Sequence, residues 1–212
     1  SSKIKHNFKH KTYLVGSPEK KMTNYFSINK KKINHKFTIL ILGGSQGSEY
    51  LTNFSINLLK IIDEEKIIDA KFIIQCPKHM IKNISSNLPK IRSEIKFDVF
   101  FDMDDVLKDT SLVISRSGAG AINDLINYRI PSILIPLPSS KDNHQLYNAN
   151  ILSNHEVAIV IDQNNNEYIK AKNYIYDIYK NKDKIRSIED RFDYIKVKNS
   201  NSQIYKLIYD EE

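Results

Sequence analysis

The chain alternates between short apolar runs and longer stretches with apolar residues at helical spacing. The first clear run is residues 37–42, FTILIL, and the stretch after it carries apolar side chains at helical spacing from Leu51 to Ile62. A continuous apolar run is typical of a parallel strand that is covered on both faces. Because this strand-then-helix order recurs along the chain, we predict an α/β fold with a doubly wound, Rossmann-like parallel sheet.

Six strands are predicted, with a division of the chain into three parts. Residues 1–36 form a basic segment and interdomain connector, residues 37–165 form the Rossmann-like domain, and residues 166–212 form C-terminal helices. Residues 11–15, KTYLV, are apolar enough for a further extended segment. The strands after the first are expected at 71–75, 96–100, 112–114, 132–135 and 157–161, and helices are expected after Pro77 and at 102–108, 166–179 and 193–209.

Residues 111–150 combine several features of a ligand site. Small residues after the strand, RSGAGA at 116–121, leave room for a phosphate to approach the backbone. The first amide groups of the following helix lack intrahelical partners and lie at the positive end of its dipole, so they suit a pyrophosphate. Asp124, about one turn into that helix, is placed to accept hydrogen bonds from the two hydroxyls of a ribose. A polar loop after the next strand adds side chains suited to a sugar: Asp142, Asn143, His144, Gln145 and Asn148.

A glycine turn alone is also expected wherever a parallel strand turns tightly into a helix for packing. The functional interpretation therefore rests on the combination of turn, acid and polar loop, because the carboxyl ends of adjacent parallel strands are where such folds bind ligands.

A second glycine turn, GGSQG at residues 43–47, follows the first strand. It lacks the spacing of a P-loop and the G-x-G-x-x-G order of a dinucleotide fingerprint. The acids about 20 residues later, at 63–65, fall near a helix end rather than at the end of a second strand. The sequence therefore disfavours kinases, GTPases and NAD-binding proteins. It favours a ligand held from two sides, such as a diphosphate between a nucleoside and a sugar.

Length and cysteine content set broad limits. With 212 residues, 41% of them hydrophobic, the chain is one large domain or two small ones. The single cysteine, Cys76, follows an apolar run, so we interpret it as a buried core residue in a reducing compartment. The sequence shows no apolar run of about 18 residues and no signal-peptide pattern. A cytoplasmic domain is therefore expected.

The net charge of +7 is concentrated in residues 1–36. These hold ten lysines and one acid, Glu19, a net of +9, which leaves 7 − 9 = −2 for the rest. A nucleic-acid surface would spread over the folded domain and include aromatic side chains, so no nucleic-acid partner is predicted. The favoured interpretation is a solvated lysine-rich segment. The alternative is attraction to anionic lipid headgroups, which would place the chain peripherally on the inner face of the plasma membrane.

Motifs for metal or nucleophilic chemistry are weak. His6 and His10 have the i, i+4 spacing of a ligand pair but no acid or cysteine nearby to complete a site. Asp102 and Asp104 form a D-x-D pair, which we interpret as a helix N-cap and a first-turn acid rather than a metal clamp. The serines of the two glycine turns have no base arranged beside them. The sequence therefore predicts no metal and no cofactor.

Four stretches of the chain resemble, in order and spacing, the MurG family of glycosyltransferases. They are GGSQG at 43–47, FFDMDDVLKD at 100–109, RSGAGAINDL at 116–125 and KDNHQLYNA at 141–149. Enzymes of this family move N-acetylglucosamine from UDP-N-acetylglucosamine onto undecaprenyl-pyrophosphoryl-N-acetylmuramoyl-pentapeptide, lipid I, to complete lipid II for peptidoglycan. They have the GT-B architecture of two Rossmann-like domains facing across a cleft. The resemblance, which covers roughly residues 12–165, implies that this chain is the C-terminal, donor-binding domain of an inverting, metal-independent enzyme.

The resemblance also implies roles for individual residues. Ser45 contacts the diphosphate or sugar, Lys20 takes the place of a family arginine, and the backbone of Phe100 pairs with the uracil edge. Asp124 holds the ribose diol. The phosphates are held by the backbone amides of residues 119–124, which are Ala119, Gly120, Ala121, Ile122, Asn123 and Asp124. The sugar hydroxyls are read by His144, Gln145 and Asn148.

This sequence departs from the family pattern in several places. Lys20 lacks the planar fork of an arginine, Ala121 stands where a hydroxyl residue is usual, and Asp124 is one methylene shorter than the usual glutamate. The family's G-G-T-G-G-H turn, from the region that binds the lipid-linked acceptor and supplies the catalytic base, does not occur in these 212 residues. The chain alone is therefore expected to bind donor without turnover. Two alternatives stay open: the catalytic subunit of a split N-acetylglucosamine transferase, and a nucleotide-binding module without catalysis.

Overall fold

The computed structural model describes residues 36–44, 47–66, 68–88, 90–195 and 200–209. These belong to two compact units: residues up to 195 lie in one, and the terminal helix α9 (Ser200–Tyr209) lies in the other. Lys20, Ser45 and the predicted extended segment at 11–15 lie outside the described residues. No described helix has both the length and the apolar content that crossing a membrane requires.

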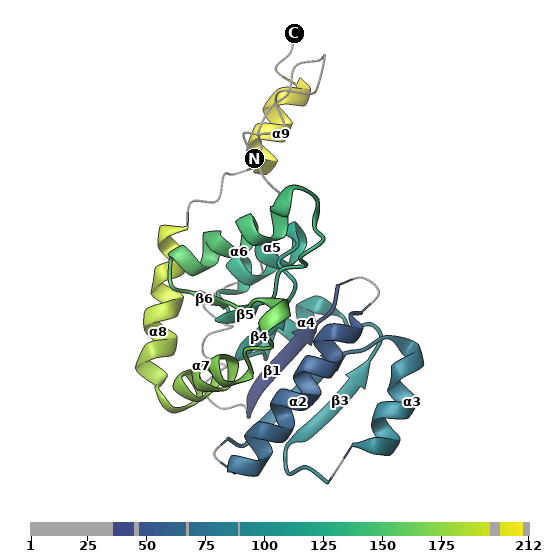
Figure 1. Cartoon of the computed structure of the whole chain (residues 1–212). Helices are drawn as coiled ribbons and strands as arrows, with labels where there is room; N and C mark the ends of the chain where they lie inside the picture. Colours follow the sequence, from purple (N-terminus) through teal and green to yellow (C-terminus); the bar gives the residue numbers. More distant parts are fainter. Residues whose placement is uncertain (1–35, 45–46, 67, 89, 196–199, 210–212) are drawn as a thin grey trace. The chain divides into compact units, whose positions relative to one another are not determined.

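A sheet of six parallel strands forms the centre of the larger unit (Figure 1). The strand order, β3-β2-β1-β4-β5-β6, is the doubly wound order: strands are added outward from β1 on one side, and the order then reverses at β4 on the other side. This confirms the predicted fold class and strand number. The strands are β1 (Phe37–Leu42), β2 (Ala70–Gln75), β3 (Glu94–Asp98), β4 (Leu112–Ser115), β5 (Ser132–Leu134) and β6 (Ala158–Val160).

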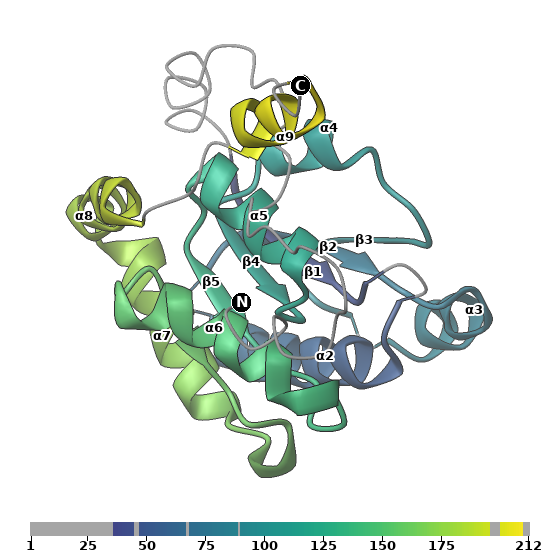
Figure 2. The same cartoon turned by 90° about the horizontal axis from the view of Figure 1, so that it is seen from above.

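Helices cover both faces of the sheet (Figures 1 and 2). Helices α2 and α7 pack against each other over one face, and α4 and α5 lie on the other, where the Tyr128 hydroxyl donates to Asp104 at 2.9 Å. The helices of this unit are α2 (Glu49–Glu65), α3 (Lys78–Asn87), α4 (Met103–Lys108), α5 (Ala119–Tyr128), α6 (His144–Asn154), α7 (Tyr168–Lys180) and α8 (Lys182–Arg191), with short 3₁₀ turns at Lys141–Asn143, Gln163–Asn165 and Phe192–Tyr194.

The predicted helix at 193–209 is wrong in part. Helix α8 precedes this stretch, and a 3₁₀ turn at Phe192–Tyr194 follows α8. The described part of the stretch beyond Ile195 forms α9 at Ser200–Tyr209. Strand β3 also starts two residues earlier than predicted. The division of domains at residue 165 stays a prediction.

The core is built by the apolar stripe of α2 against β1 and β2. Leu51, Phe54 and Leu58 are at most 1% exposed, and the Phe54 ring stacks on the Tyr168 ring of α7 with centroids 4.8 Å apart. Cys76 is fully buried just after β2, as predicted. This packing fixes α2 and α7 on the sheet and leaves the carboxyl ends of the central strands to carry loops.

Candidate functional site

A cavity of about 790 Å³ lies at the carboxyl ends of the central strands. Its lining includes the glycine turn after β1, the residues after β3, the turn into α5 after β4, and the loop after β5. The cavity therefore sits beside the point where the strand order reverses, which is the usual ligand position in open α/β sheets.

Two glycines of the first turn, Gly43 and Gly47, have no room for a side chain. A Cβ atom on Gly43 would lie 2.2 Å from the Ser48 amide nitrogen, and one on Gly47, which has φ of +75°, would lie 2.9 Å from Pro77. The nearly buried Gln75 holds this turn from β2, because its Oε1 accepts from the Gly43 amide at 3.1 Å. These two glycines are therefore required by the packing of the turn, which lies in the lining of the cavity.

The second glycine turn opens α5 without a side-chain cap. Gly118 is the N-cap residue and makes no side-chain hydrogen bond, whereas the amide of Ile122 already donates to the Gly118 carbonyl at 3.0 Å. The amides of Ala119, Gly120 and Ala121 precede that first helical bond, so they have no intrahelical partner and are available to an anion.

The structure brings five of the predicted residues together around the cavity: Phe100, Gly120, Ala121, Asp124 and Gln145. Asp124 and Gln145 come from different helices, α5 and α6, yet both line the same space. Ile122 is 6% exposed and its side chain belongs to the core.

Two residues predicted to read the sugar have partners inside the protein. The imidazole Nδ1 of His144 lies 2.7 Å from the Lys141 carbonyl oxygen, and this exposed side chain is outside the cavity lining. The side-chain amide of Asn148 donates to the Ser117 carbonyl at 3.0 Å. Both residues therefore shape the loop around the cavity, and Gln145 is the member of this group that lines it.

Arg116 is a cavity residue that the sequence-based site prediction did not include. Its Nη1 donates to the carbonyl oxygens of Ile135 at 3.0 Å and Pro136 at 3.3 Å, and its guanidinium carbon lies 5.4 Å from the centroid of the Tyr50 ring. Burial lowers the pKa of this guanidinium, which still remains charged near neutral pH. Among the described residues that line the cavity, Arg116 is the one cation and Asp124 the one anion. The sequence signal that could have identified Arg116 is its position directly before the second glycine turn.

The D-x-D pair has the structural role that we predicted. The Asp102 side chain accepts from the amides of Asp104 and Asp105 and so caps α4, and the Asp104 carboxylate accepts from Tyr128. Within the described ranges, no group of three or more His, Cys, Asp or Glu side chains is placed to hold a metal ion.

The model of the glycosyltransferase family 28 C-terminal domain matches residues 38–204 of this chain. The chain belongs to this family.

Relatives of this family 28 domain carry one shared description. A Rickettsia massiliae (strain Mtu5) protein is 33% identical over 169 residues, which cover 79% of this chain and 45% of the relative. A Wolbachia pipientis wMel protein is 29% identical over 171 residues, covering 80% and 50%. Each is named UDP-N-acetylglucosamine–N-acetylmuramyl-(pentapeptide) pyrophosphoryl-undecaprenol N-acetylglucosamine transferase. The chain spans about half the length of these curated relatives.

Solved structures show the same fold. The crystal structure of Acinetobacter baumannii MurG aligns with a TM-score of 0.73 at 20% identity, over 87% of this chain and 52% of that one. The glycosyltransferase VinC in complex with dTDP aligns with a TM-score of 0.59 at 14% identity, over 82% and 41%.

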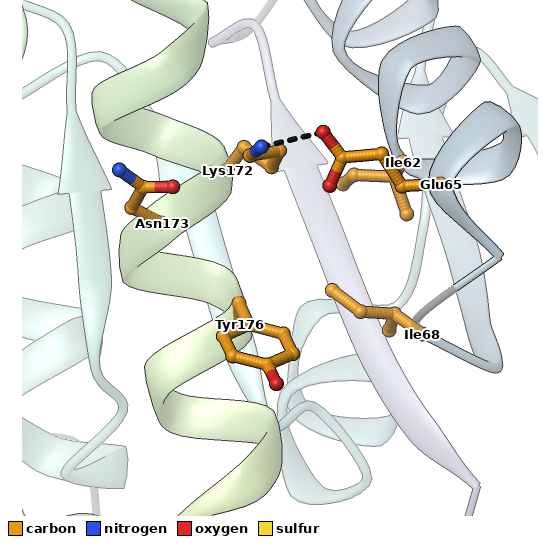
Figure 3. Close-up of a pocket in the computed structure, with 6 residues that line it drawn as sticks. All are labelled: Ile62, Glu65, Ile68, Lys172, Asn173 and Tyr176. Carbon is orange, nitrogen blue, oxygen red and sulfur yellow. Dashed lines mark hydrogen bonds and ion pairs between the residues drawn. The ribbon is translucent and has the colours of Figure 1, made fainter.

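A second pocket in the family 28 domain, of about 290 Å³, lies between the end of α2 and α7 (Figure 3). It lies next to the start of β2, so it is near the amino-terminal ends of the strands, whereas the larger cavity is at their carboxyl ends. Its charged groups neutralise each other, because Lys172 Nζ lies 2.6 Å from Glu65 Oε1. Nothing in this arrangement points to a particular ligand.

Proposed function

We propose that this chain is the donor-binding half of a glycosyltransferase that moves N-acetylglucosamine from UDP-N-acetylglucosamine to lipid I. The observation that carries the proposal is that both glycine turns line the same cavity, together with Asp124 and Gln145. The family 28 match and the names of the curated relatives support this choice of donor and acceptor.

The residues of the cavity suit the parts of a UDP-sugar. The diphosphate lies at the amides that open α5, where the helix dipole and the positive charge of Arg116 favour an anion. Asp124 accepts from the ribose diol, the backbone of Phe100 pairs with uracil, and Gln145 contacts the sugar. Oriented amides stabilise the UDP leaving group as the glycosidic bond breaks, without a metal ion. Ser45 and Lys20 complete the site as the family resemblance implies.

The acceptor half is part of the same proposal. The curated relatives are about twice as long as the matched region, so acceptor binding and the catalytic base are assigned to a further domain or a partner subunit. The second of these is the split-transferase alternative. In both cases the 212-residue chain alone binds donor and produces no lipid II.

Binding to donor analogues tests the proposed function directly. Calorimetric titration is expected to show tighter binding of UDP and UDP-N-acetylglucosamine than of ADP-sugars or NAD, because the site is assigned to uracil. The result should be the same with and without EDTA, because oriented amides and Arg116 replace a cation. Preference for adenine nucleotides, or loss of binding in EDTA, would contradict the proposal.

The basic segment provides a separate prediction about membrane attachment. If its +9 net charge attracts anionic lipids, the full chain should co-sediment with vesicles containing acidic phospholipid. Removal of residues 1–11 should weaken this binding, and added salt should weaken it further because surface charges are screened. Equal sedimentation of both versions would leave the lysines as a solvated segment.

A further inference from the structure

A continuous set of hydrogen bonds joins the turn after β4 to the loop after β5. Arg116 donates to the Pro136 carbonyl at 3.3 Å, and the Leu137 amide donates to the Oε1 atom of Gln145 at 3.0 Å. The Pro136 carbonyl and the Leu137 amide belong to one peptide unit, which is planar. Arg116 and Gln145 are therefore hydrogen-bonded to the same rigid peptide unit.

The donor and acceptor roles in these hydrogen bonds determine which side-chain atom Gln145 presents to a ligand. A backbone amide is only a donor, so the Gln145 atom that faces Leu137 must be the oxygen. The Nε2 group is then the part of the side chain available to the cavity. It can only donate, so its ligand partner is an acceptor such as a hydroxyl or phosphate oxygen. The main chain of Gln145 is fixed as well, because its carbonyl accepts from the Ser117 hydroxyl at 2.7 Å.

Arg116 is also contacted by Tyr50 of α2, in addition to its hydrogen bonds to the loop after β5. Its guanidinium carbon lies over the Tyr50 ring, 5.4 Å from the ring centroid. The Tyr50 hydroxyl lies 3.0 Å from the Gln163 carbonyl oxygen and 3.1 Å from Asn166 Oδ1. Burial raises the pKa of the Tyr50 phenol, so it stays a neutral donor near neutral pH. The guanidinium is thus fixed between α2, β4 and the loop after β5.

We propose that Arg116 is a positioning residue for Gln145: it fixes the Pro136–Leu137 peptide so that the glutamine directs its Nε2 group to an acceptor oxygen of the sugar. The inference rests on the proposed function for the identity of the ligand. Arg116 acts through the chain of bonds rather than by being the group that reads the sugar.

A double-mutant cycle on the full chain tests this coupling. Gln145→Ala is expected to weaken UDP-N-acetylglucosamine binding about fivefold, the loss of one neutral hydrogen bond. In the Arg116→Met background the same change should cost less than about twofold, because the glutamine is no longer held toward the sugar. Calorimetric titration of the parent, both single variants and the double variant gives the four affinities. Additive effects, with Gln145→Ala costing the same in both backgrounds, would overturn the proposal even if Arg116→Met weakens binding through lost charge.

A matched control separates positioning from general destabilisation. Arg129 also donates from its guanidinium to a backbone carbonyl, that of Glu189, but it does not line the cavity. Arg129→Met should lower the unfolding temperature while leaving the cost of Gln145→Ala at about fivefold, the full value of the hydrogen bond. Loss of coupling in this background too would mean that any weakening of the fold removes it.

Hydrogen exchange in the ligand-free protein gives a readout that does not depend on the donor. The Leu137 amide should exchange faster in both Arg116→Met and Gln145→Ala than in the parent, because its acceptor is misplaced or missing. Arg129→Met should leave it unchanged. Unchanged exchange in Arg116→Met would contradict the positioning role even if UDP-N-acetylglucosamine is not the ligand. Failure of the parent to bind that sugar nucleotide, with exchange as expected, would contradict only the proposed function.

Discussion

Replacing Asp124 with alanine is expected to weaken UDP and UDP-N-acetylglucosamine alike by about 1.5 to 3 kcal/mol, the usual value of hydrogen bonds to a charged group. Both ligands carry the ribose, and Asp124 lines the cavity from α5 next to the amides assigned to the diphosphate. Calorimetric titration of the variant with each ligand, after its thermal unfolding has been checked, measures the loss.

Two variants control for charge and for fold. Asp124→Glu keeps a carboxylate and restores the residue usual in the resembling family, so it should retain binding. Asp183→Ala removes a highly exposed acid of α8 and should leave both affinities unchanged. If Asp124→Ala binds UDP as the parent does, the carboxylate does not hold the ribose and the assignment of the cavity is wrong.

Leu58→Ala is expected to lower the free energy of unfolding by about 2 to 5 kcal/mol, because it removes a buried side chain and leaves a cavity in the core. Leu58 is fully buried on the face of α2 that covers the sheet. The ratio of the affinities for UDP and UDP-N-acetylglucosamine should stay unchanged, because the residue is part of the core rather than of the cavity lining. Denaturant unfolding followed by titration gives both quantities.

Ile169→Ala is the matched control for the core substitution. This side chain is also aliphatic and lies on α7, but it is 59% exposed. Its loss should change stability by no more than about 0.5 kcal/mol, as is usual for surface positions. A comparable loss from both variants would mean that Leu58 is not the core contact that its burial indicates.

The strands at the centre of the sheet could be predicted because each is buried on both faces and reads as a continuous apolar run. Strand β3 is at the edge of the sheet, and its side chains are intermediate or exposed, so its start was misplaced by two residues. Helix α8 buries only Ile188, which leaves too little apolar periodicity to predict a helix.

The residues of the candidate site also fall into two groups, those that local sequence motifs predict and those whose role depends on the folded sheet. Gly120, Asp124 and Gln145 lie in local motifs whose spacing already indicates a ligand site. The roles of Gln75 and Arg116 depend on partners 32 and 19 residues away in sequence, which only the folded sheet brings together. The predicted sugar contact of His144 stays a prediction, and its hydrogen bond to Lys141 within its own loop is a contact that spacing alone does not indicate.

The pairing of β1 with β4 also determines when a growing chain can complete the lining of the cavity. Thr38 and Ser111, which are hydrogen-bonded at the start of this pair, are 73 residues apart in sequence. The first glycine turn therefore leaves the ribosome long before the second, and Gln145 follows later still. A nascent chain that stops before β4 has only half of the cavity lining. Ligand added during synthesis should protect the chain from proteolysis only after the α6 region has emerged, because binding stabilises only the folded state.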